Sequence, residues 1–503
     1  MNTSTPSSGA SRRNPRRRRP SGAPGGSNNN TASLDTRGAG QASAMDAADL
    51  VPSSAPVAPA ADFTELNVPA PIVASLTRDG ILTPFPIQTA TLPDSLAGRD
   101  VLGRGKTGSG KTIAFAIPTV VRLAESGAKR ETKKPRALIL VPTRELANQV
   151  AETLTPIAAA MGQKVAVVFG GVGQGPQVTA LRLGVDILVA CPGRLEDLIS
   201  QRHCRLDLVE VTVLDEADHM ADLGFLPAVK RLLDQTPANA QRLLFSATLD
   251  NGIDVLVKRY LTNPVVHSVD PAVAPVSTMT HHVFAVSIAD KPAVIKELAQ
   301  GVDRALLFMR TKHGAKKLAK TLSMAGIPAV EMHGNLSQNA RERNLESFSE
   351  GTTRVLVATD IAARGIHVDD IALVIHVDPP AEHKAYLHRS GRTARAGAEG
   401  IVVTLMTPDQ VGDVKALARA AKIEPIITRV APGHAMLEHL VGIAAPLVRY
   451  SAPIETPQGP GRSGAGRSTG AHRGGPSAGR PGARSGGGRQ SSGRSGGSGN
   501  RSR

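Results

Sequence analysis

The sequence has no tryptophan, aromatic side chains at only 2% of its positions, and only two cysteines among 503 residues. Because hydrophobic residues still make up 41% of the chain, its cores must be packed mainly with aliphatic side chains. The two cysteines, Cys191 and Cys204, are too few for a disulfide framework and fit a reducing compartment. These scarcities exclude a small, disulfide-stabilised secreted protein.

The sequence also lacks an uninterrupted apolar run long enough to cross a bilayer. Its arginine-rich beginning is not followed by the apolar stretch of a signal peptide. We therefore expect a soluble, monomeric protein of the cytoplasm that has no membrane partner.

The net charge of +16 is concentrated at the two ends of the chain. Residues 1–61 contain seven arginines and three acidic residues, and residues 451–503 contain nine arginines and one acidic residue. Arginine-rich segments bind polyanions such as nucleic acids, because they neutralise phosphates and release counterions. The alternative, that these ends only keep the chain soluble, is equally compatible with charge alone.

The composition divides the chain into two tails and a folded centre. Residues 1–61 and 455–503 are rich in Ser, Gly, Pro and Arg, which cannot bury enough apolar surface to offset the entropy of folding, so we expect disordered tails. We expect the second tail to bind RNA. Between the tails, β-branched runs alternate with helical stretches, a pattern typical of parallel sheets covered by helices.

The alternation is interrupted at residues 268–279, which contain Pro271 and Pro275 and are predicted to be a linker. We therefore predict an α/β protein with two tandem parallel-sheet domains at 62–267 and 280–430, and a short extension at 431–454. Such sheets bind ligands at the carboxyl ends of their strands. The predicted strands are 100–105, 136–142, 164–170, 186–192, 208–215 and 242–248 in the first domain, and 304–310, 327–334, 354–360, 371–378 and 400–406 in the second.

A glycine-rich segment, GKTGSGKT, directly follows the first predicted strand. It has the spacing of a P-loop, whose backbone N–H groups surround phosphates beside the positive end of the next helix. The strand before it and the apolar helix after it favour this interpretation over a simple glycine-rich turn. Lys111 is expected to reach the β- and γ-phosphates of the nucleotide, and Thr112 to hold Mg²⁺. The expected nucleotide-binding residues of this segment are Gly105, Lys106, Thr107, Gly108, Ser109, Gly110, Lys111 and Thr112.

A P-loop requires acidic residues at the end of a neighbouring strand, and VTVLDEAD provides them. Asp215, at the strand end, is expected to bind the metal through water. Glu216 is expected to orient and deprotonate the attacking water. Without the apolar strand before it and the P-loop upstream, the same letters would indicate a solvated helix start.

Residues 215–218 spell Asp-Glu-Ala-Asp, and with the other motifs in order the chain resembles DEAD-box ATP-dependent RNA helicases. The resemblance covers about residues 62–430 and is closest to bacterial members. It implies two RecA-like domains, ATP and Mg²⁺ as cofactors, and RNA as a partner that is bound without sequence specificity.

TPFPIQ, at residues 83–88, resembles the segment with which this family recognises adenine. The resemblance implies that Gln88 binds the adenine edge and that Phe63 stacks on the base. Without the family, Gln88 is a polar residue at a helix start and Phe63 a core residue. Phe85 stands where the family usually has threonine.

Further segments resemble the family's RNA-facing loops: PTRELA, Gly170–Gly171 and CPGR in the first domain, and HGNLSQNARE and ATDIAARGIHV in the second. Cys191 stands where the family has threonine and, with no second cysteine or histidine in its segment, is expected only to pack. His367 stands where the family has aspartate. The resemblance assigns RNA contacts to Pro142, Thr143, Arg144, Gly171, Arg194, Gln338, Arg341 and Thr359.

Two more segments link hydrolysis to movement in this family, SAT at 246–248 and HRSGRTAR at 388–395. Arg392 and Arg395 resemble the arginine fingers, and a spacing of three places both on one face if the segment is helical. The alternative is a solvated, basic helix end. The resemblance implies that coupling involves Asp218, Ser246, Thr248 and His388.

The resemblance therefore implies an ATP-dependent RNA helicase that unwinds duplexes locally or remodels RNA–protein complexes. Two alternatives remain: an ATP-gated RNA clamp with little productive unwinding, and a DNA helicase with the same core. Ribosome assembly, messenger decay and cold adaptation all use this core, so ribosomal particles and RNA-decay proteins are the partner classes that it suggests.

Overall fold

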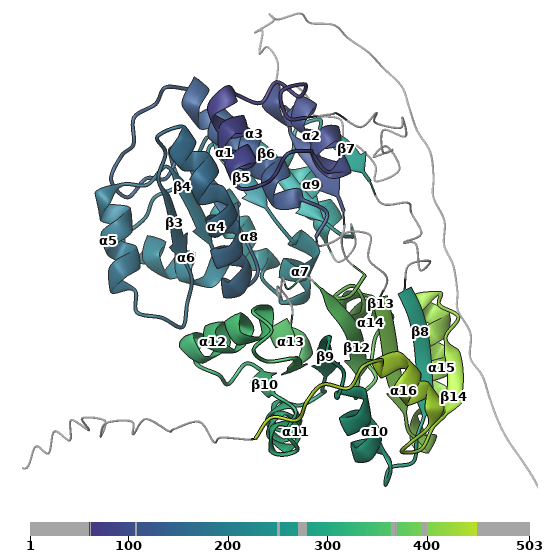
Figure 1. The fold of residues 1–503 in the computed structure, drawn as a ribbon. Coiled ribbons are helices and arrows are strands. Elements are labelled where there is room, and N and C mark those ends of the chain that lie inside the picture. The colour runs from purple at the N-terminus through teal and green to yellow at the C-terminus, as the bar shows by residue number, and fades with distance from the viewer. Residues whose placement is uncertain are drawn as a thin grey trace, which may run out of the picture. The chain divides into compact units, whose positions relative to one another are not determined.

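The computed structural model describes residues 60, 62–105, 108–248, 252–269, 279–363, 368, 370–394 and 400–449 (Figure 1). Within them the chain forms two seven-stranded sheets, and neighbouring strands in both sheets run parallel. The predicted α/β class with tandem parallel sheets is therefore confirmed. The predicted tails, apart from Ala60, lie outside the described residues.

The first sheet has the strand order β3-β4-β2-β5-β6-β1-β7. Each of the six strands predicted for this domain overlaps one of the observed strands, although β6 begins one residue before its prediction. The seventh, β7, was not predicted because it is a four-residue edge strand that directly follows Pro264. The strands are β1 (Val101–Arg104), β2 (Ala137–Leu140), β3 (Val165–Val168), β4 (Ile187–Ala190), β5 (Val211–Leu214), β6 (Gln241–Ser246) and β7 (Val265–Ser268).

Helices cover both faces of this sheet. Successive strand residues point to opposite faces, so Leu244 packs in one apolar core and Phe245 in the other, where its ring centroid lies 5.6 Å from that of Phe115. One face is covered by α1 (Ala70–Arg78), α2 (Pro86–Leu96), α3 (Lys111–Glu125) and α4 (Arg144–Ala160). The other is covered by α5 (Gly175–Leu183), α6 (Pro192–Ser200), α7 (Ala217–Asp222), α8 (Leu226–Leu233) and α9 (Ile253–Tyr260).

The second sheet has the strand order β10-β11-β9-β12-β13-β8-β14. Two of its strands were not predicted: β8, where His281 and His282 interrupt the apolar pattern, and β14, an edge strand whose Ile426 and Ile427 remain exposed. The strands are β8 (Met279–Ala285), β9 (Arg304–Phe308), β10 (Ala329–Met332), β11 (Val355–Ala358), β12 (Ile371–His376), β13 (Gly400–Met406) and β14 (Ile426–Arg429). Ser268 and Met279, the ends of the predicted linker, thus belong to strands.

The second sheet is also covered on both faces (Figure 1). One face carries α10 (Lys291–Leu298), α11 (Lys312–Met324) and α16 (Ala435–Val441). The other carries α12 (Gln338–Ser349), α13 (Asp360–Ala363), α14 (His383–Ser390) and α15 (Val411–Ala421), with the short 3-10 helix η3 (Pro408–Gln410) before α15.

The segment after β14 is part of this second domain. Its helix α16 packs against α10, and backbone N–H groups of Ala445 and Val448 donate to Gln300 and Gly326, both at 2.8 Å. Among the described residues, no helix combines the length and the hydropathy that a membrane span requires.

Candidate functional site

The predicted P-loop connects β1 to α3, with Gly110 as the residue that precedes the helix. Gly110 has φ +88°, and a Cβ atom there would lie 2.5 Å from the side-chain nitrogen of Gln88. Glycine is therefore required by both the backbone conformation and the space. The structure confirms that the segment is a turn between a strand and a helix. Lys106 and Thr107 lie outside the described residues.

Lys111 is the first residue of α3 and has only 6% of its surface exposed. Its Nζ donates a hydrogen bond to the carbonyl oxygen of Gly105, 3.0 Å away, so the ammonium group is directed at the loop rather than at solvent. Thr112 follows in the first turn of the helix and is half-buried. The cation, the hydroxyl and the helix N-terminus together form a site suited to phosphate.

Gln88 lies beside the same loop. Its Nε2 donates to the carbonyl oxygen of Gly110 at 2.9 Å, and its Oε1 accepts from the backbone N–H of Phe85 at 2.9 Å. Phe63, in contrast, is 1% exposed and packs within the core under α1–α4. Neighbouring apolar side chains cover the ring in this structure, and stacking of Phe63 on adenine stays a prediction.

Asp215 follows β5, and its side chain is 3% exposed. Burial, together with the nearby charges of Glu216 and Asp218, raises the pKa of its carboxyl to about 6, although the charge of Lys111 acts to lower it. A buried carboxylate whose ionised form is disfavoured gains from a divalent cation. Asp215 and the hydroxyl of Thr112 therefore fit the predicted Mg²⁺.

Glu216 has the left-handed φ of +49°, which is uncommon for a residue with a side chain. Burial disfavours its charge, yet a hydrogen bond and the positive charge from His219, with Lys111, hold the pKa of the carboxyl well below its usual range. Glu216 Oε2 lies 3.1 Å from His219 Nδ1. Glu216 is therefore an ionised, buried base next to Asp215.

The predicted coupling residues of the first domain form one hydrogen-bonded cluster. Asp218 Oδ2 accepts from the backbone N–H of Thr248 at 3.0 Å and from its hydroxyl at 3.2 Å. Ser246 Oγ accepts from the backbone N–H of Asp218 at 3.2 Å and donates to the carbonyl of Thr248 at 2.7 Å. The segment after β6 is thereby linked directly to α7.

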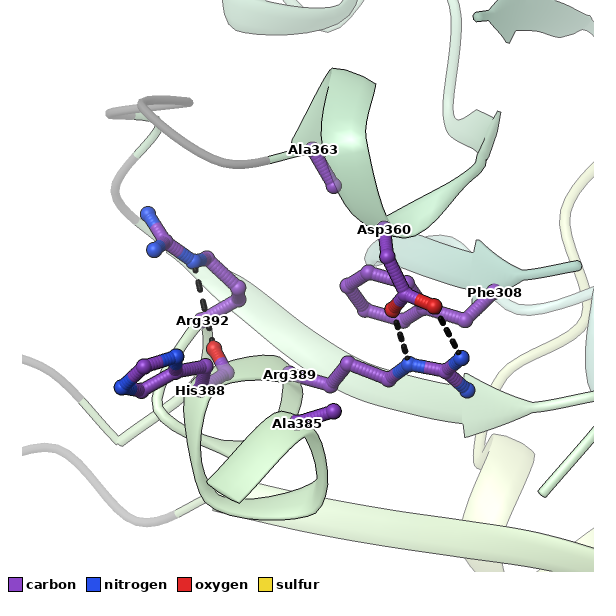
Figure 2. Close-up of a pocket in the computed structure, with 7 residues that line it drawn as sticks. All are labelled: Phe308, Asp360, Ala363, Ala385, His388, Arg389 and Arg392. Carbon is purple, nitrogen blue, oxygen red and sulfur yellow. Dashed lines mark hydrogen bonds and ion pairs between the residues drawn. The ribbon is translucent and has the colours of Figure 1, made fainter. Parts of the chain in front are cut away.

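In the second domain, Arg389 of α14 and Arg392, two residues after the end of that helix, extend in different directions (Figure 2). Arg389 is directed at Asp360, whereas Arg392 extends away from that pair and donates from Nε to the carbonyl of His388 at 3.4 Å. The sequence singled out Arg392 but missed Arg389, although the arginine lies inside the same motif. Arg395 lies outside the described residues.

The RNA contacts predicted for the first domain gather at the carboxyl ends of β2, β3 and β4. Thr143 begins α4 and its hydroxyl accepts from the N–H of Leu146. A Cβ atom at Gly171 would lie 2.1 Å from Arg144 Nη1, so the guanidinium packs on this glycine. Arg194 Nη2 donates to the carbonyl of Val172 at 3.1 Å. Pro142 is buried at the end of β2.

In the second domain, Gln338 and Arg341 lie in the first turn of α12, which Ser337 caps through its hydroxyl. Arg341 Nη2 approaches the carbonyl of Ala362 at 3.5 Å. Thr359 follows β11, and its N–H donates to Met332 at 3.1 Å. The three predicted residues thus lie near the carboxyl ends of β10 and β11.

Cys191, in the first domain, begins α6. Burial raises the pKa of its thiol to about 12, in agreement with a packing role.

Two family models match the chain, "DEAD/DEAH box helicase" over residues 85–255 and "Helicase conserved C-terminal domain" over residues 290–397. The ATP-dependent RNA helicase RhlB of Sodalis glossinidius is 39% identical over 349 residues, which are 68% of this chain and 84% of the relative. The DEAD-box ATP-dependent RNA helicase CshA of Bacillus subtilis is 36% identical over 362 residues, 72% of each chain.

Other relatives are longer than the part they share with this chain. The chain spans 63% of DEAD-box ATP-dependent RNA helicase 30 of Arabidopsis thaliana, with 36% identity, and 49% of the chloroplastic helicase 3A of Zea mays, with 39% identity.

Solved structures share the two-domain fold. Saccharomyces cerevisiae Dbp5 bound to RNA and ADP BeF3 is 26% identical with a TM-score of 0.66, over 76% of this chain and 100% of that chain. Mss116p bound to single-stranded RNA and AMP-PNP is 26% identical with a TM-score of 0.67, over 78% and 83%. These matches confirm the two predicted RecA-like domains. Together with the family models and the bacterial relatives, they show that the chain belongs to the DEAD-box helicase family.

Proposed function

We propose that this protein is an ATP-dependent RNA helicase, which binds RNA and separates short duplexes or remodels RNA–protein complexes while it hydrolyses ATP. The observation that carries the proposal is the buried group of Lys111, Asp215 and Glu216, at the carboxyl ends of β1 and β5. Two buried carboxylates are unexpected in an ordinary hydrophobic core, whereas both are suited to a site that transfers a phosphoryl group to water.

The first domain binds the nucleotide. The P-loop N–H groups and the N-terminus of α3 surround the phosphates, and Lys111 exchanges its hydrogen bond to Gly105 for the terminal phosphates. Asp215 and Thr112 hold Mg²⁺, which when bound neutralises charge on the phosphate oxygens. ATP is favoured as the nucleotide because Gln88 lies beside the loop, where it can bind the adenine edge.

Glu216 orients the attacking water and accepts its proton. Its low pKa keeps the carboxylate ionised at neutral pH, so that it is always able to accept a hydrogen bond. The second domain contributes positive charge to the γ-phosphate from Arg392, just after α14. Hydrolysis therefore requires both domains to engage the same nucleotide.

RNA binds through its phosphates and sugars at the carboxyl ends of the strands. Arg144 and Arg194 supply positive charge in the first domain, and Gln338, Arg341 and Thr359 supply polar groups in the second. The solved structures of Dbp5 and Mss116p, which are bound to RNA, support RNA as the partner. Contacts to the backbone explain binding without sequence specificity.

Coupling follows from the cluster of Asp218, Ser246 and Thr248, which links the acidic motif to the segment after β6. A change in the position of Asp218 on phosphate release would be transmitted to this segment.

Ribosomal particles and RNA-decay proteins are the partners that we propose. A monomer in the cytoplasm is the proposed setting, supported by the unpaired Cys191 and Cys204.

The test is strand separation by the purified full-length protein. A short RNA duplex with a labelled strand should dissociate with ATP and remain paired with a non-hydrolysable analogue. A DNA duplex of the same sequence is the control. ATP hydrolysis without release of the labelled strand would favour the RNA clamp, and equal release of DNA would favour a DNA helicase.

A further inference from the structure

His219 is a buried histidine that contacts the acidic motif and has no role in the mechanism described so far. It lies in α7, three residues after Glu216, and is 6% exposed. Its Nδ1 lies 3.1 Å from Glu216 Oε2, and its backbone N–H donates to Asp218 Oδ1 at 3.0 Å. Both ends of the residue are therefore held by the motif.

The hydrogen bond between His219 and Glu216 has one possible direction. The oxygen of a carboxylate accepts hydrogen bonds, so the hydrogen in this contact must be carried by Nδ1 of the imidazole. The other nitrogen, Nε2, is buried and has no hydrogen-bond partner among the described residues. If the imidazole carried its hydrogen only on Nε2, Nδ1 would face the carboxylate with no hydrogen between them. The geometry therefore requires Nδ1–H.

Glu216 depends on this contact more than an ordinary glutamate would. Its left-handed backbone aims the side chain from an uncommon conformation, and its carboxylate interacts electrostatically with both the like charge of Asp215 and the cation of Lys111. A directional donor on a short helix fixes which oxygen faces the imidazole.

We propose that His219 is a positioning residue for hydrolysis, whose Nδ1–H fixes the orientation of the Glu216 carboxylate. The inference rests on the proposed function, because it takes Glu216 as the group that accepts the proton from water. Among the described residues, His219 is hydrogen-bonded to Glu216, whereas the P-loop lysine Lys111 is hydrogen-bonded to Gly105. His219 therefore acts on the chemical step and leaves ATP binding unaffected.

A pair of variants separates positioning from packing. In asparagine the side-chain nitrogen occupies nearly the place of Nδ1, whereas in glutamine it occupies nearly the place of Nε2. H219Q should therefore lose the hydrogen bond to Glu216, and H219N should keep it. H313Q, at an exposed histidine of α11, is the matched control for the histidine-to-glutamine change.

ATP turnover is measured at saturating RNA with the full-length chain. We expect H219Q to lower kcat by about 10-fold, with the KM for ATP within about 2-fold of the wild type, since a misdirected base slows the chemistry alone. H219N should recover most of the lost kcat, and H313Q should match the wild type. Equal losses in H219N and H219Q, or a kcat for H219Q equal to the wild type, would overturn the proposal.

A second measurement needs no turnover. Nitrogen-15 NMR of histidine-labelled protein, without nucleotide, reports which imidazole nitrogen carries hydrogen, and H219N identifies the signals of His219. We expect a protonated Nδ1; a bare Nδ1 with a protonated Nε2 contradicts the proposal. If the wild type hydrolyses no ATP, the proposed function fails, and the NMR result still decides whether His219 donates to Glu216.

Discussion

Arg389 and Asp360 form a two-pronged ion pair, in which Nε and Nη2 of the arginine donate to the two carboxylate oxygens at 2.5 and 2.7 Å (Figure 2). The arginine is 4% exposed; Nη1 donates to the carbonyl of Asp378, and the guanidinium carbon lies 5.0 Å from the ring centre of Phe308. The pair joins α14 to α13. Because Arg392 lies only two residues after the end of α14, the pair also fixes the helix that precedes the proposed arginine finger.

Removal of Asp360 should therefore affect stability and activity together. D360A leaves a buried guanidinium without its carboxylate, and we expect a loss of roughly 2 kcal/mol in the unfolding free energy, after discounting for the partial exposure of Asp360. R389K is the companion variant, because lysine retains the charge but loses the fork. Urea unfolding followed by circular dichroism measures the effect. Wild-type stability in D360A would show that the pair contributes nothing.

Gly171 should control RNA affinity through Arg144. G171A places a methyl group where the guanidinium lies and disfavours φ +80°, so Arg144 must move. We expect RNA to bind about 5-fold to 10-fold more weakly, a change of about 1 kcal/mol. G170A is the matched control, because a Cβ there meets nothing within 4 Å. Fluorescence anisotropy with labelled RNA gives both affinities, and equal values for the two variants would rule out this role.

Gly110 should control ATP binding through the shape of the P-loop. In G110A the new methyl group would collide with Gln88 and strain the left-handed turn before Lys111, so we expect the KM for ATP to rise by at least about 10-fold. G127A introduces comparable backbone strain, at φ +61°, where nothing lies within 4 Å. Steady-state ATPase assays compare the two. A KM that rises equally in both would assign the effect to general strain.

The second domain should lose stability in acid through His281. Burial, and then the charge of His282, lower the pKa of His281 to about 4, and its Nδ1 lies 2.8 Å from the hydroxyl of Tyr386. Since the unfolded chain binds the proton more tightly, stability is complete above about pH 6.5 and is lost as pH falls toward 4. The loss should be on the order of 3 kcal/mol at pH 4.

Thermal unfolding between pH 7 and pH 4 measures this dependence. H281N removes the titrating group and should flatten the profile, although buried His376, whose pKa also lies well below its usual value, still contributes. H313N, at an exposed position, should leave the profile as it is in the wild type. Identical profiles for H281N and the wild type would contradict the assignment.

The sequence predicted the features that depend on local pattern. The central strands of both sheets are apolar runs bounded by turn residues. The P-loop and the acidic motif follow strand ends, positions where glycines and carboxylates have few structural roles apart from binding a ligand. Edge strands β7 and β14 were missed because they are short and half-exposed, and β8 because two histidines interrupt its apolar pattern.

The site details that the sequence missed depend on tertiary contacts. Arg389 and Asp360 lie far apart along the chain, and nothing local distinguishes Arg389 from Arg392. His219 could have been singled out as the only titratable side chain that follows the acidic motif within one turn of Glu216. The burial of Phe63 in the core of the first domain likewise depends on tertiary packing, which no short motif records.

The central claim is that rapid ATP hydrolysis by this protein requires bound RNA. The decisive measurement is the ATP turnover of the full-length protein with and without saturating RNA, for the wild type and K111A. We expect RNA to raise wild-type turnover by at least about 10-fold, and K111A to lose turnover in both conditions, because the ammonium group is needed at the terminal phosphates. Equal wild-type turnover with and without RNA, or undiminished turnover in K111A, would contradict it.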